Sequence, residues 1–274
     1  MNLLVNPRIE SQLASLETSL PHALLLTGER GVGKTSIAKA LAGNKLHTLV
    51  EPLSVKGDID HEKGSIRVEQ IRQLYPRASA KSANSKVIII DKADTMSPGA
   101  QNAFLKLLEE PPETTCFVLL AEQPSLLLAT IHSRVQTLAI PYITVKQSEA
   151  LLKDLGVTDP TILRQIIFVA KGRPALLKYY RNNPKKLAES GALLRDAQTL
   201  IRGSFDEQMR LVGSYSASRS DALALLEAAK TILLHTLSTQ PSVEIVRSLA
   251  CLGTAHERVS ANANVRLQLL EFVL

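Results

Sequence analysis

Short apolar runs in the first half of the chain alternate with segments whose apolar residues recur every three or four positions. Each run is short enough for a buried strand, which predicts strands at residues 22–27, 86–91, 116–121 and 136–140. The helical periodicity between the runs predicts helices at residues 8–19, 35–42, 67–75 and 98–109. Strands that alternate with helices in this way are typical of a parallel α/β sheet.

Prolines and polar stretches indicate where these elements end. Residues 43–65 are polar and contain Gly and Pro, so we expect a loop there. Pro76 is expected to end or bend the helix before it, because proline lacks the N–H that a helix interior needs. Pro98 stands instead at a favourable first position of its helix.

The strand signals stop after Pro141. Residues 146–182 predict two or three short helices, and residues 184–274 are helical almost throughout. In this last segment we expect more apolar side chains than a small domain buries alone, at Leu223, Leu225, Leu226, Ile232 and Leu233. We therefore expect three domains, namely an α/β domain at 1–142, a small helical domain at 143–183 and a helical domain at 184–274.

Composition excludes several classes of protein. Hydrophobic residues make up 45% of the chain and charged residues 21%, which is typical of globular proteins and argues against disorder. The net charge of +6 is spread along the chain, so it is compatible with a nucleic-acid partner without indicating one. Cys116 and Cys251 stand far apart, which argues against a disulfide framework or a zinc site and fits a reducing cytoplasm. With no signal-peptide core and no apolar run of roughly 18 residues, we expect a soluble cytoplasmic protein with no membrane partner.

A phosphate-binding loop is the first motif with a specific chemistry. Residues 28–35, GERGVGKT, fit GxxxxGK[ST] between a predicted strand and a predicted helix, the context that the motif requires. Its glycines let backbone N–H groups point at phosphate oxygens, and the helix adds its positive N-terminal end. Lys34 would contact the β- and γ-phosphates of ATP, and Thr35 would hold Mg²⁺. The expected nucleotide-binding residues are Gly28, Gly31, Val32, Gly33, Lys34 and Thr35.

The end of the second predicted strand carries the acidic residue that such a loop needs. Asp91 closes the run KVIIID and is expected to reach the magnesium shell together with Thr35. The next position, where a hydrolase places a second carboxylate, is Lys92, which cannot accept a proton while it is charged. Asp94 is expected to face elsewhere. The site should therefore bind ATP and hydrolyse it poorly, unless Lys92 points to solvent and another group serves.

Longer motifs resemble one known family. The run from Asp91 to Pro112, DKADTMSPGAQNAFLKLLEEPP, is similar to the clamp-loader ATPase signature DEADxMxxxAQNALLKxLEEPP. The stretch from Ile131 to Gln136, IHSRVQ, resembles the IxSRCQ motif of the same AAA+ family, whose branches include the delta-prime and gamma/tau subunits of DNA polymerase III. The resemblance covers roughly residues 8–180. It implies a P-loop AAA+ domain with a parallel sheet, a small helical lid, and a helical C-terminal collar domain that drives oligomerisation.

Departures from the family pattern favour the delta-prime branch. Gamma/tau subunits are intact ATPases with Asp-Glu in the second strand, a Thr after the third, and a four-cysteine zinc module. This chain has Lys92 after Asp91, Glu122 near the expected Thr, and no cysteine between Gly43 and Ile66, so we expect no structural zinc. Many delta-prime subunits lack a usable P-loop, however, and have the zinc module. The intact loop and the missing module therefore depart from that branch too.

The resemblance also implies roles for basic residues. Arg134, in the SRx motif, would reach the ATP of a neighbouring subunit, and Arg173, before a helix in the second domain, is the candidate sensor of nucleotide in the same chain. Each is otherwise an ordinary surface arginine. Candidate contacts to DNA phosphates, which are more often a solvated face, are Arg67, Arg72, Arg77, Lys81 and Lys86.

The leading hypothesis is a non-motor subunit of the DNA polymerase III clamp loader, acting in DNA replication. Its expected cofactors are ATP and Mg²⁺, and its own ATPase activity is expected to be weak or absent. Its expected partners are gamma/tau-type and delta-type subunits, the sliding clamp, and primer-template DNA through the assembled complex. Two alternatives stay open: an active gamma/tau-like motor ATPase, and a structural adaptor with a vestigial P-loop.

Overall fold

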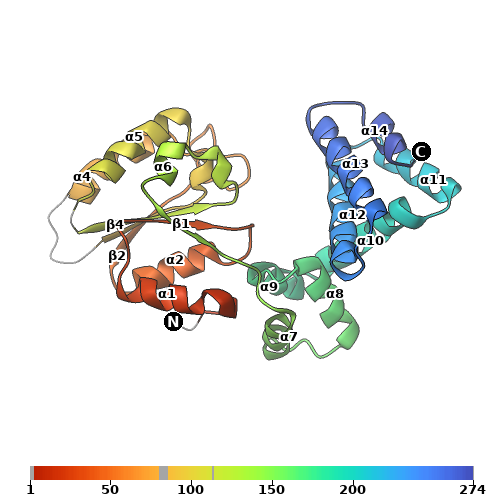
Figure 1. Ribbon diagram of the computed structural model, residues 1–274, viewed down its shortest axis with the longest axis horizontal. Helices are drawn as coiled ribbons and strands as arrows, with labels where there is room; N and C mark the ends of the chain where they lie inside the picture. The colour runs from red at the N-terminus through yellow and green to blue at the C-terminus, as the bar shows by residue number, and fades with distance from the viewer. Residues whose placement is uncertain (1–2, 80–85, 113, 274) are drawn as a thin grey trace. The chain divides into compact units, whose positions relative to one another are not determined.

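The computed structural model describes residues 3–79, 86–112 and 114–273 (Figure 1). The chain divides into two compact units, residues 1–181 and 182–274. The first holds the sheet and the helices α1 to α9, and the second is helical. Within residues 3–79, 86–112 and 114–273, no helix is long and apolar enough to cross a bilayer.

A five-stranded parallel sheet forms the centre of the first unit. The strands follow the order β2-β3-β4-β1-β5. Their bounds are β1 Ala23–Thr27, β2 Leu46–Val50, β3 Lys86–Ile90, β4 Thr115–Ala121 and β5 Gln136–Ala139. The structure therefore confirms the α/β parallel-sheet class. Because the strands are parallel, all their carboxyl ends meet at one edge of the sheet, where ligands bind in such folds.

Helices cover both faces of this sheet, as Figure 1 shows. Successive side chains of a strand point to opposite faces, so Leu25 packs on one side and Leu24 and Leu26 on the other. The Leu25 face is covered by α3 Val68–Arg72, α4 Leu74–Ser79, α5 Pro98–Glu109 and α6 Ala129–His132. The Leu24 face is covered by η1 Pro7–Ile9, α1 Glu10–Thr18 and α2 Lys34–Ala42. Burial on both faces explains why β1, β3 and β4 are nearly continuous apolar runs.

Two elements differ from the sequence-based expectation. Residues 43–65 are not all loop, because β2 lies within them. β2 is an edge strand that pairs with β3 alone, and its His47 and Thr48 interrupt the apolar run. The helix expected at residues 67–75 is interrupted at Gln73, between α3 and α4, which agrees with a bend near Pro76, but Pro76 itself lies in the first turn of α4, where no intrahelical N–H is needed.

Three short helices complete the first unit, within the expected number of two or three. They are α7 Val145–Asp154, α8 Pro160–Ala170 and α9 Pro174–Asn182. Thr144 caps α7 by accepting a hydrogen bond from Gln147 N, while the Gln147 amide oxygen accepts one from Thr144 N. The amide nitrogen of Gln147 donates to Val5 O at 2.8 Å. These bonds fasten the helical segment to the sheet-containing part of the unit.

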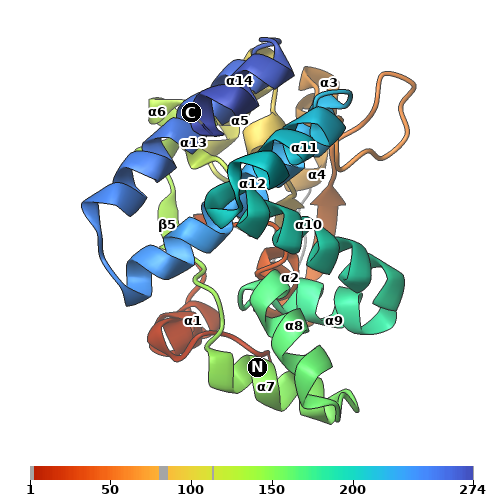
Figure 2. The same ribbon diagram turned by 90° about the vertical axis from the view of Figure 1, so that its right-hand side faces the viewer.

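The described residues of the second unit form five helices. They are α10 Pro184–Arg202, α11 Phe205–Tyr215, α12 Arg219–Thr239, α13 Val243–Ser260 and α14 Val265–Val273. The central α12 packs against α10 and α13, and α14 packs against α11 and α13 (Figure 2).

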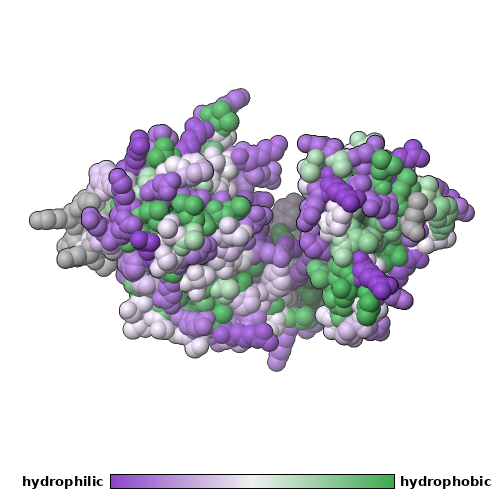
Figure 3. Space-filling model, turned by 45° about the horizontal axis from the view of Figure 1, so that its top comes forward, coloured by the Kyte–Doolittle hydropathy of each residue, from purple (hydrophilic) through white to green (hydrophobic). Residues whose placement is uncertain are grey.

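Apolar burial in this unit corrects one sequence-based expectation. The side chains of Leu225, Leu226, Ile232 and Leu233 are buried within the unit, and Leu223 is partly buried. They are therefore not surplus apolar surface, because the neighbouring helices cover them. Figure 3 shows apolar side chains that do remain exposed on the surface. In the second unit the large exposed ones are Phe205, Leu234, Val243, Val246 and Leu267.

Candidate nucleotide-binding site

The loop between β1 and α2 has the backbone conformation that its glycines permit. Gly28, Gly31 and Gly33 have φ values of 146°, 92° and 100°, which side-chain-bearing residues rarely adopt. A Cβ atom on Gly28 would also lie 2.8 Å from Ile140 O. Gly33 is the left-handed residue that precedes α2, so the loop leads directly into the positive end of that helix.

Lys34 is folded into this loop. Its side chain is 8% exposed, and its ammonium donates hydrogen bonds to Gly28 O and, at 3.0 Å, to Glu29 O. Burial lowers the pKa of Lys34, while Glu122, Asp94 and Asp91 act in the opposite direction in that order of strength. The ammonium therefore lies within the field of three carboxylates from the carboxyl ends of β3 and β4.

Two of these carboxylates have different surroundings. Asp91 directly follows β3, and its N–H donates to Val50 O at 2.9 Å. Asp94 accepts hydrogen bonds from Glu122 N at 3.0 Å and Gln123 N at 2.7 Å through one oxygen. Asp94 therefore ties the turn η2, Ala93–Thr95, to the end of β4, while the Asp91 carboxylate accepts a hydrogen bond from Lys92 N at 3.0 Å and lies 3.8 Å from His61 Nδ1.

Lys92 is not directed freely into solvent. Its backbone is left-handed, with φ 51°, and its side chain is 19% exposed. The ammonium donates to His61 O and lies 3.9 Å from the Glu122 carboxylate. The residue after Asp91 is therefore a lysine whose ammonium is held in place. The nearby carboxylate belongs to Glu122, which directly follows the neighbouring strand β4.

The helical segment contacts the loop through Glu29. Arg173 forms an ion pair with Glu29 at 3.2 Å, and its Nε donates to Ala170 O at 3.0 Å. The hydroxyl of Tyr142 donates to the same Glu29 carboxylate. Burial, followed by this hydrogen bond, raises the pKa of Tyr142 to about 12. Ala175 N donates to Gly31 O at 3.1 Å, so Arg173 and α9 lie beside the phosphate-binding loop of the same chain.

Arg134 lies at the other end of the sheet. It precedes β5, which runs parallel to β1, whereas the loop follows β1. A strand of five residues spans about 17 Å, and this distance separates the two ends of β1. The Arg134 guanidinium pairs with Glu109 at 3.0 Å and donates to Thr130 O at 3.0 Å, and its side chain is 36% exposed.

Known proteins similar to this chain identify its family. A family profile described as "DNA polymerase III, delta subunit" matches residues 47–144. The chain is 34% identical over an alignment 292 positions long to DNA polymerase III subunit delta-prime of Bacillus subtilis, a match that covers 90% of this chain and 88% of that subunit. The chain belongs to the delta-prime family of DNA polymerase III subunits.

Two other proteins are similar to this delta-prime-family chain, one over about half of its length and one over nearly all of it. It is 37% identical over 151 residues to the tau subunit of Bacillus subtilis, which covers 48% of this chain and spans only 27% of that subunit. A solved DNA polymerase III gamma subunit-related protein from Thermotoga maritima superposes with a TM-score of 0.59 at 22% identity and covers 97% of each chain. This second likeness shows a shared fold, in agreement with the expected AAA+ class.

The basic residues considered for DNA contact differ in accessibility in this delta-prime-family chain. Arg67 is half-buried and donates to Ser54 O, and Lys86 donates to Arg77 O at 3.1 Å. Arg72 and Arg77 are exposed on α3 and α4. Lys81 lies outside the described residues.

Sequence analysis missed Glu29 and Tyr142 as members of this site. Glu29 stands at a variable position of GxxxxGK[ST], and Tyr142 is the first residue after the proline where strand signals stop. The contacts of Glu29 with Arg173 and Tyr142 join positions more than 110 residues apart, so no local pattern indicates them.

Proposed function

We propose that this chain is a clamp-loader subunit that binds ATP with Mg²⁺, turns it over slowly, and supplies Arg134 to the nucleotide site of a neighbouring subunit. The observation that carries the proposal is the pairing of an intact loop around Lys34 with a lysine at position 92. Membership of the delta-prime family supports the assembly in which such a subunit acts.

The loop supplies what triphosphate binding needs. Backbone N–H groups of the loop, including those of Gly31, Val32 and Gly33, would hold phosphate oxygens together with the N-terminal end of α2. Lys34 would exchange its bonds to Gly28 O and Glu29 O for bonds to the β- and γ-phosphates. Mg²⁺ would neutralise phosphate charge, with Thr35 and Asp91 as its protein ligands. Arg173, next to the loop, would pair with the bound phosphates and thereby sense the nucleotide.

Slow hydrolysis follows from the charge of Lys92. A general base must accept a proton from the attacking water, and a charged ammonium cannot do so. The Lys92 ammonium is also held by His61 O and by Glu122, so its position is fixed near the carboxyl end of β3. This chain is thus expected to bind ATP but to hydrolyse it slowly.

Action in trans is supported by the distance between Arg134 and the chain's own loop. The two lie at opposite ends of parallel strands, so the guanidinium cannot reach phosphates bound near Lys34. It is partly exposed and would meet the phosphates of another subunit. An arginine in that place stabilises the charge that develops on the transferred phosphoryl group.

Assembly would use the second unit and the family's partners. We propose that residues 182–274 form the oligomerising collar, joining gamma/tau-type and delta-type subunits, and that the assembled complex meets the sliding clamp and primer-template DNA. The exposed side chains of Leu234, Val243 and Val246 support this role, because they leave apolar surface for a neighbour. Arg72 and Arg77 are the most accessible candidates for DNA phosphates.

The proposal is tested with the purified full-length chain. Calorimetric titration with ATP and Mg²⁺ should show binding that Lys34→Ala abolishes, and steady-state turnover should stay well below about 1 s⁻¹, the lower end of working kinases. Turnover at or above that rate would refute slow hydrolysis. If the chain does not bind ATP, the remaining alternative is a structural adaptor whose loop is vestigial.

A motor ATPase is the second candidate, and the position of Glu122 favours it. Among the carboxylates, Glu122 raises the pKa of Lys34 most. It also lies 3.9 Å from the ammonium of Lys92, the position at which the family has its hydrolytic carboxylate. In that case Glu122→Gln should remove measurable turnover and keep ATP binding. If Glu122→Gln changes neither, the slow-turnover proposal stands.

A further inference from the structure

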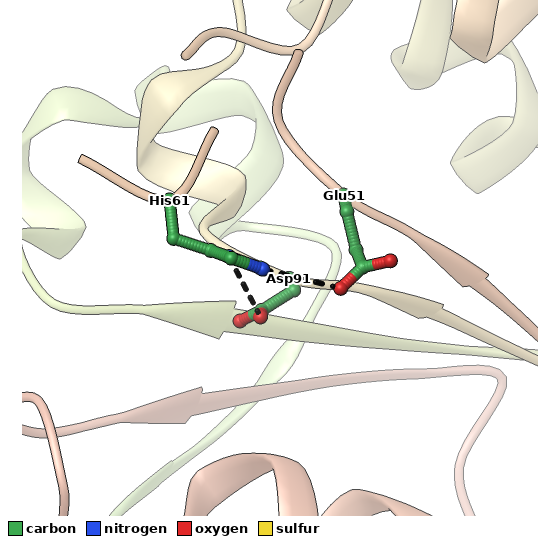
Figure 4. Close-up of side chains that lie close together, drawn as sticks. All are labelled: Glu51, His61 and Asp91. Atoms are coloured by element: carbon green, nitrogen blue, oxygen red, sulfur yellow. Dashed lines mark ion pairs between the residues drawn. The ribbon is translucent and has the colours of Figure 1, made fainter. Parts of the chain in front are cut away.

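Three side chains from separate segments converge beside the carboxyl ends of β2 and β3. Glu51 directly follows β2, Asp91 directly follows β3, and the pairing of Val50 with Ile90 sets the two carboxylates side by side. His61 comes from the segment that connects Val50 to α3. Figure 4 shows its imidazole lying between the two carboxylates.

These three groups lie close enough to share an ion after small side-chain movements. His61 Nε2 lies 3.3 Å from Glu51 Oε1, whereas the other ring nitrogen, Nδ1, lies 3.8 Å from Asp91 Oδ2. One ligand atom from each residue can be chosen so that all three lie within 4.8 Å of one another. Around a tetrahedral Zn²⁺, neighbouring ligand atoms stand about 3.3–3.6 Å apart, so the side chains would have to move by about 1 Å to bring one imidazole nitrogen and both carboxylates around one ion.

The segment that carries His61 is held by its own backbone. Leu53 and Ser65 exchange two hydrogen bonds at 3.0 Å each. The Asp60 side chain accepts from the N–H groups of Glu62 and Lys63, both at 2.9 Å. A Cβ atom on Gly64 would collide with Asp60 O, so this turn requires a glycine. The imidazole is therefore presented to the two carboxylates by a preformed turn, which reduces the cost of ordering ligands around an ion.

The charges and exposure of the cluster suit a cation. Its side chains are 40%, 25% and 17% exposed for His61, Glu51 and Asp91, which leaves a path from solvent. The nearby Lys92 ammonium is already engaged by His61 O and Glu122. Two carboxylates thus lie beside one imidazole.

We propose that Glu51, His61 and Asp91 bind a divalent transition-metal ion, Zn²⁺ or Mn²⁺, through one imidazole nitrogen and one oxygen from each carboxylate. Imidazole nitrogen suits such ions, whereas Mg²⁺ demands near-ideal octahedral oxygen ligation. The ion fastens the His61 segment to the end of β3 through the carboxylate of Asp91, which would also serve the Mg²⁺ of bound ATP, so the site is tested in the absence of nucleotide. No cysteine takes part, so the site differs from a four-cysteine module.

The test is a calorimetric titration of the metal-stripped full-length chain, without nucleotide, with Zn²⁺, Mn²⁺ or Mg²⁺. We expect Zn²⁺ or Mn²⁺ to bind with one ion per chain and to bind more tightly than Mg²⁺. Loss of a ligand should weaken that binding at least about tenfold in His61→Ala and in Glu51→Gln. Lys34→Ala should retain it, which separates this site from the nucleotide site.

The matched control is His22→Ala, which removes an exposed histidine from another part of the chain. It should bind the metal as the unchanged chain does. The proposal is overturned if Mg²⁺ binds as tightly as Zn²⁺ and Mn²⁺, or if none of the three binds stoichiometrically. It is equally overturned if Glu51→Gln and His61→Ala, with unchanged circular dichroism, bind Zn²⁺ and Mn²⁺ as the unchanged chain does.

Discussion

Replacing Arg134 by alanine should lower the ATPase rate of an assembled clamp loader while leaving this chain intact. The substitution breaks an ion pair with Glu109 in which the two side chains are 36% and 51% exposed. Such an exposed pair contributes about 0–1 kcal/mol, so the melting temperature should fall by no more than about 4 °C. The chain's own ATP affinity should not change, because Arg134 lies at the opposite end of the sheet from Lys34.

The effect on turnover should be much larger at the site that receives the guanidinium. An arginine that contacts the transferred phosphoryl group accelerates related reactions by about 10³–10⁵. Because one such arginine serves one interface among several, the total rate should fall partially, unless the sites act together. The assay is DNA-stimulated ATPase and clamp loading in a reconstituted complex that contains the substituted subunit.

Glu109→Gln provides the control for this measurement. It breaks the same ion pair and keeps the guanidinium, so the loader's ATPase rate should stay close to that of the unchanged complex. An unchanged rate with Arg134→Ala, in a complex that still assembles, would show that Arg134 is an ordinary surface residue. Equal losses with Arg134→Ala and Glu109→Gln would show that the ion pair acts by shaping the surface instead.

Three further predictions, which use four substitutions and one deletion, test other parts of the reasoning. Lys92→Glu should raise steady-state turnover by up to the roughly 10²–10⁴ that a general base contributes, whereas Lys92→Gln should not; a null result for Lys92→Glu would count against the argument from charge. Gly28→Ala should lower stability by about 1–3 kcal/mol and weaken ATP binding, since its Cβ would meet Ile140 O at 2.8 Å and its φ is 146°. Gly57→Ala, also at positive φ but in open space, should leave ATP binding unchanged, and equal loss in both would point to general destabilisation. A chain without residues 182–274 should still bind ATP through its first unit but fail to join other loader subunits, and normal assembly of this truncated chain would exclude the second unit as the oligomerising collar.

Local patterns in the sequence account for the parts of the fold that were predicted correctly. Strands β1, β3 and β4 are buried on both faces, so each is a continuous apolar run. The conformation of the loop between β1 and α2 is also indicated by its motif, because positive φ at Gly28, Gly31 and Gly33 favours glycine at those positions. Strand β2 was missed because it is at the sheet edge and mixes polar with apolar residues.

Features that depend on tertiary neighbours could not be predicted from local patterns. The exposure of Leu225 and Leu233 is set by helices packed against α12, so their apolar character alone did not reveal that they are buried. The same holds for Glu51 and His61, which meet Asp91 only through the register of β2 against β3 and a turn in the connecting segment. The spacing of residues along the chain does not indicate which residues of β2 and β3 pair.

The residues proposed for ATP binding and those proposed for hydrolysis follow different strands of the sheet, so one function could be kept while the other is weak. In the proposed function, ATP binding would depend on β1, the loop and α2, where glycine conformation is set by local sequence and Lys34 is buried. Turnover would depend on the residue that follows Asp91 at the end of β3, two strands away in the sheet. Lys92 is held there by Glu122 and His61 O, while Gly28, Gly31 and Gly33 of the loop have positive φ. A lysine at the end of β3, where a hydrolytic carboxylate is expected, is therefore compatible with the loop conformation that the glycine motif predicts.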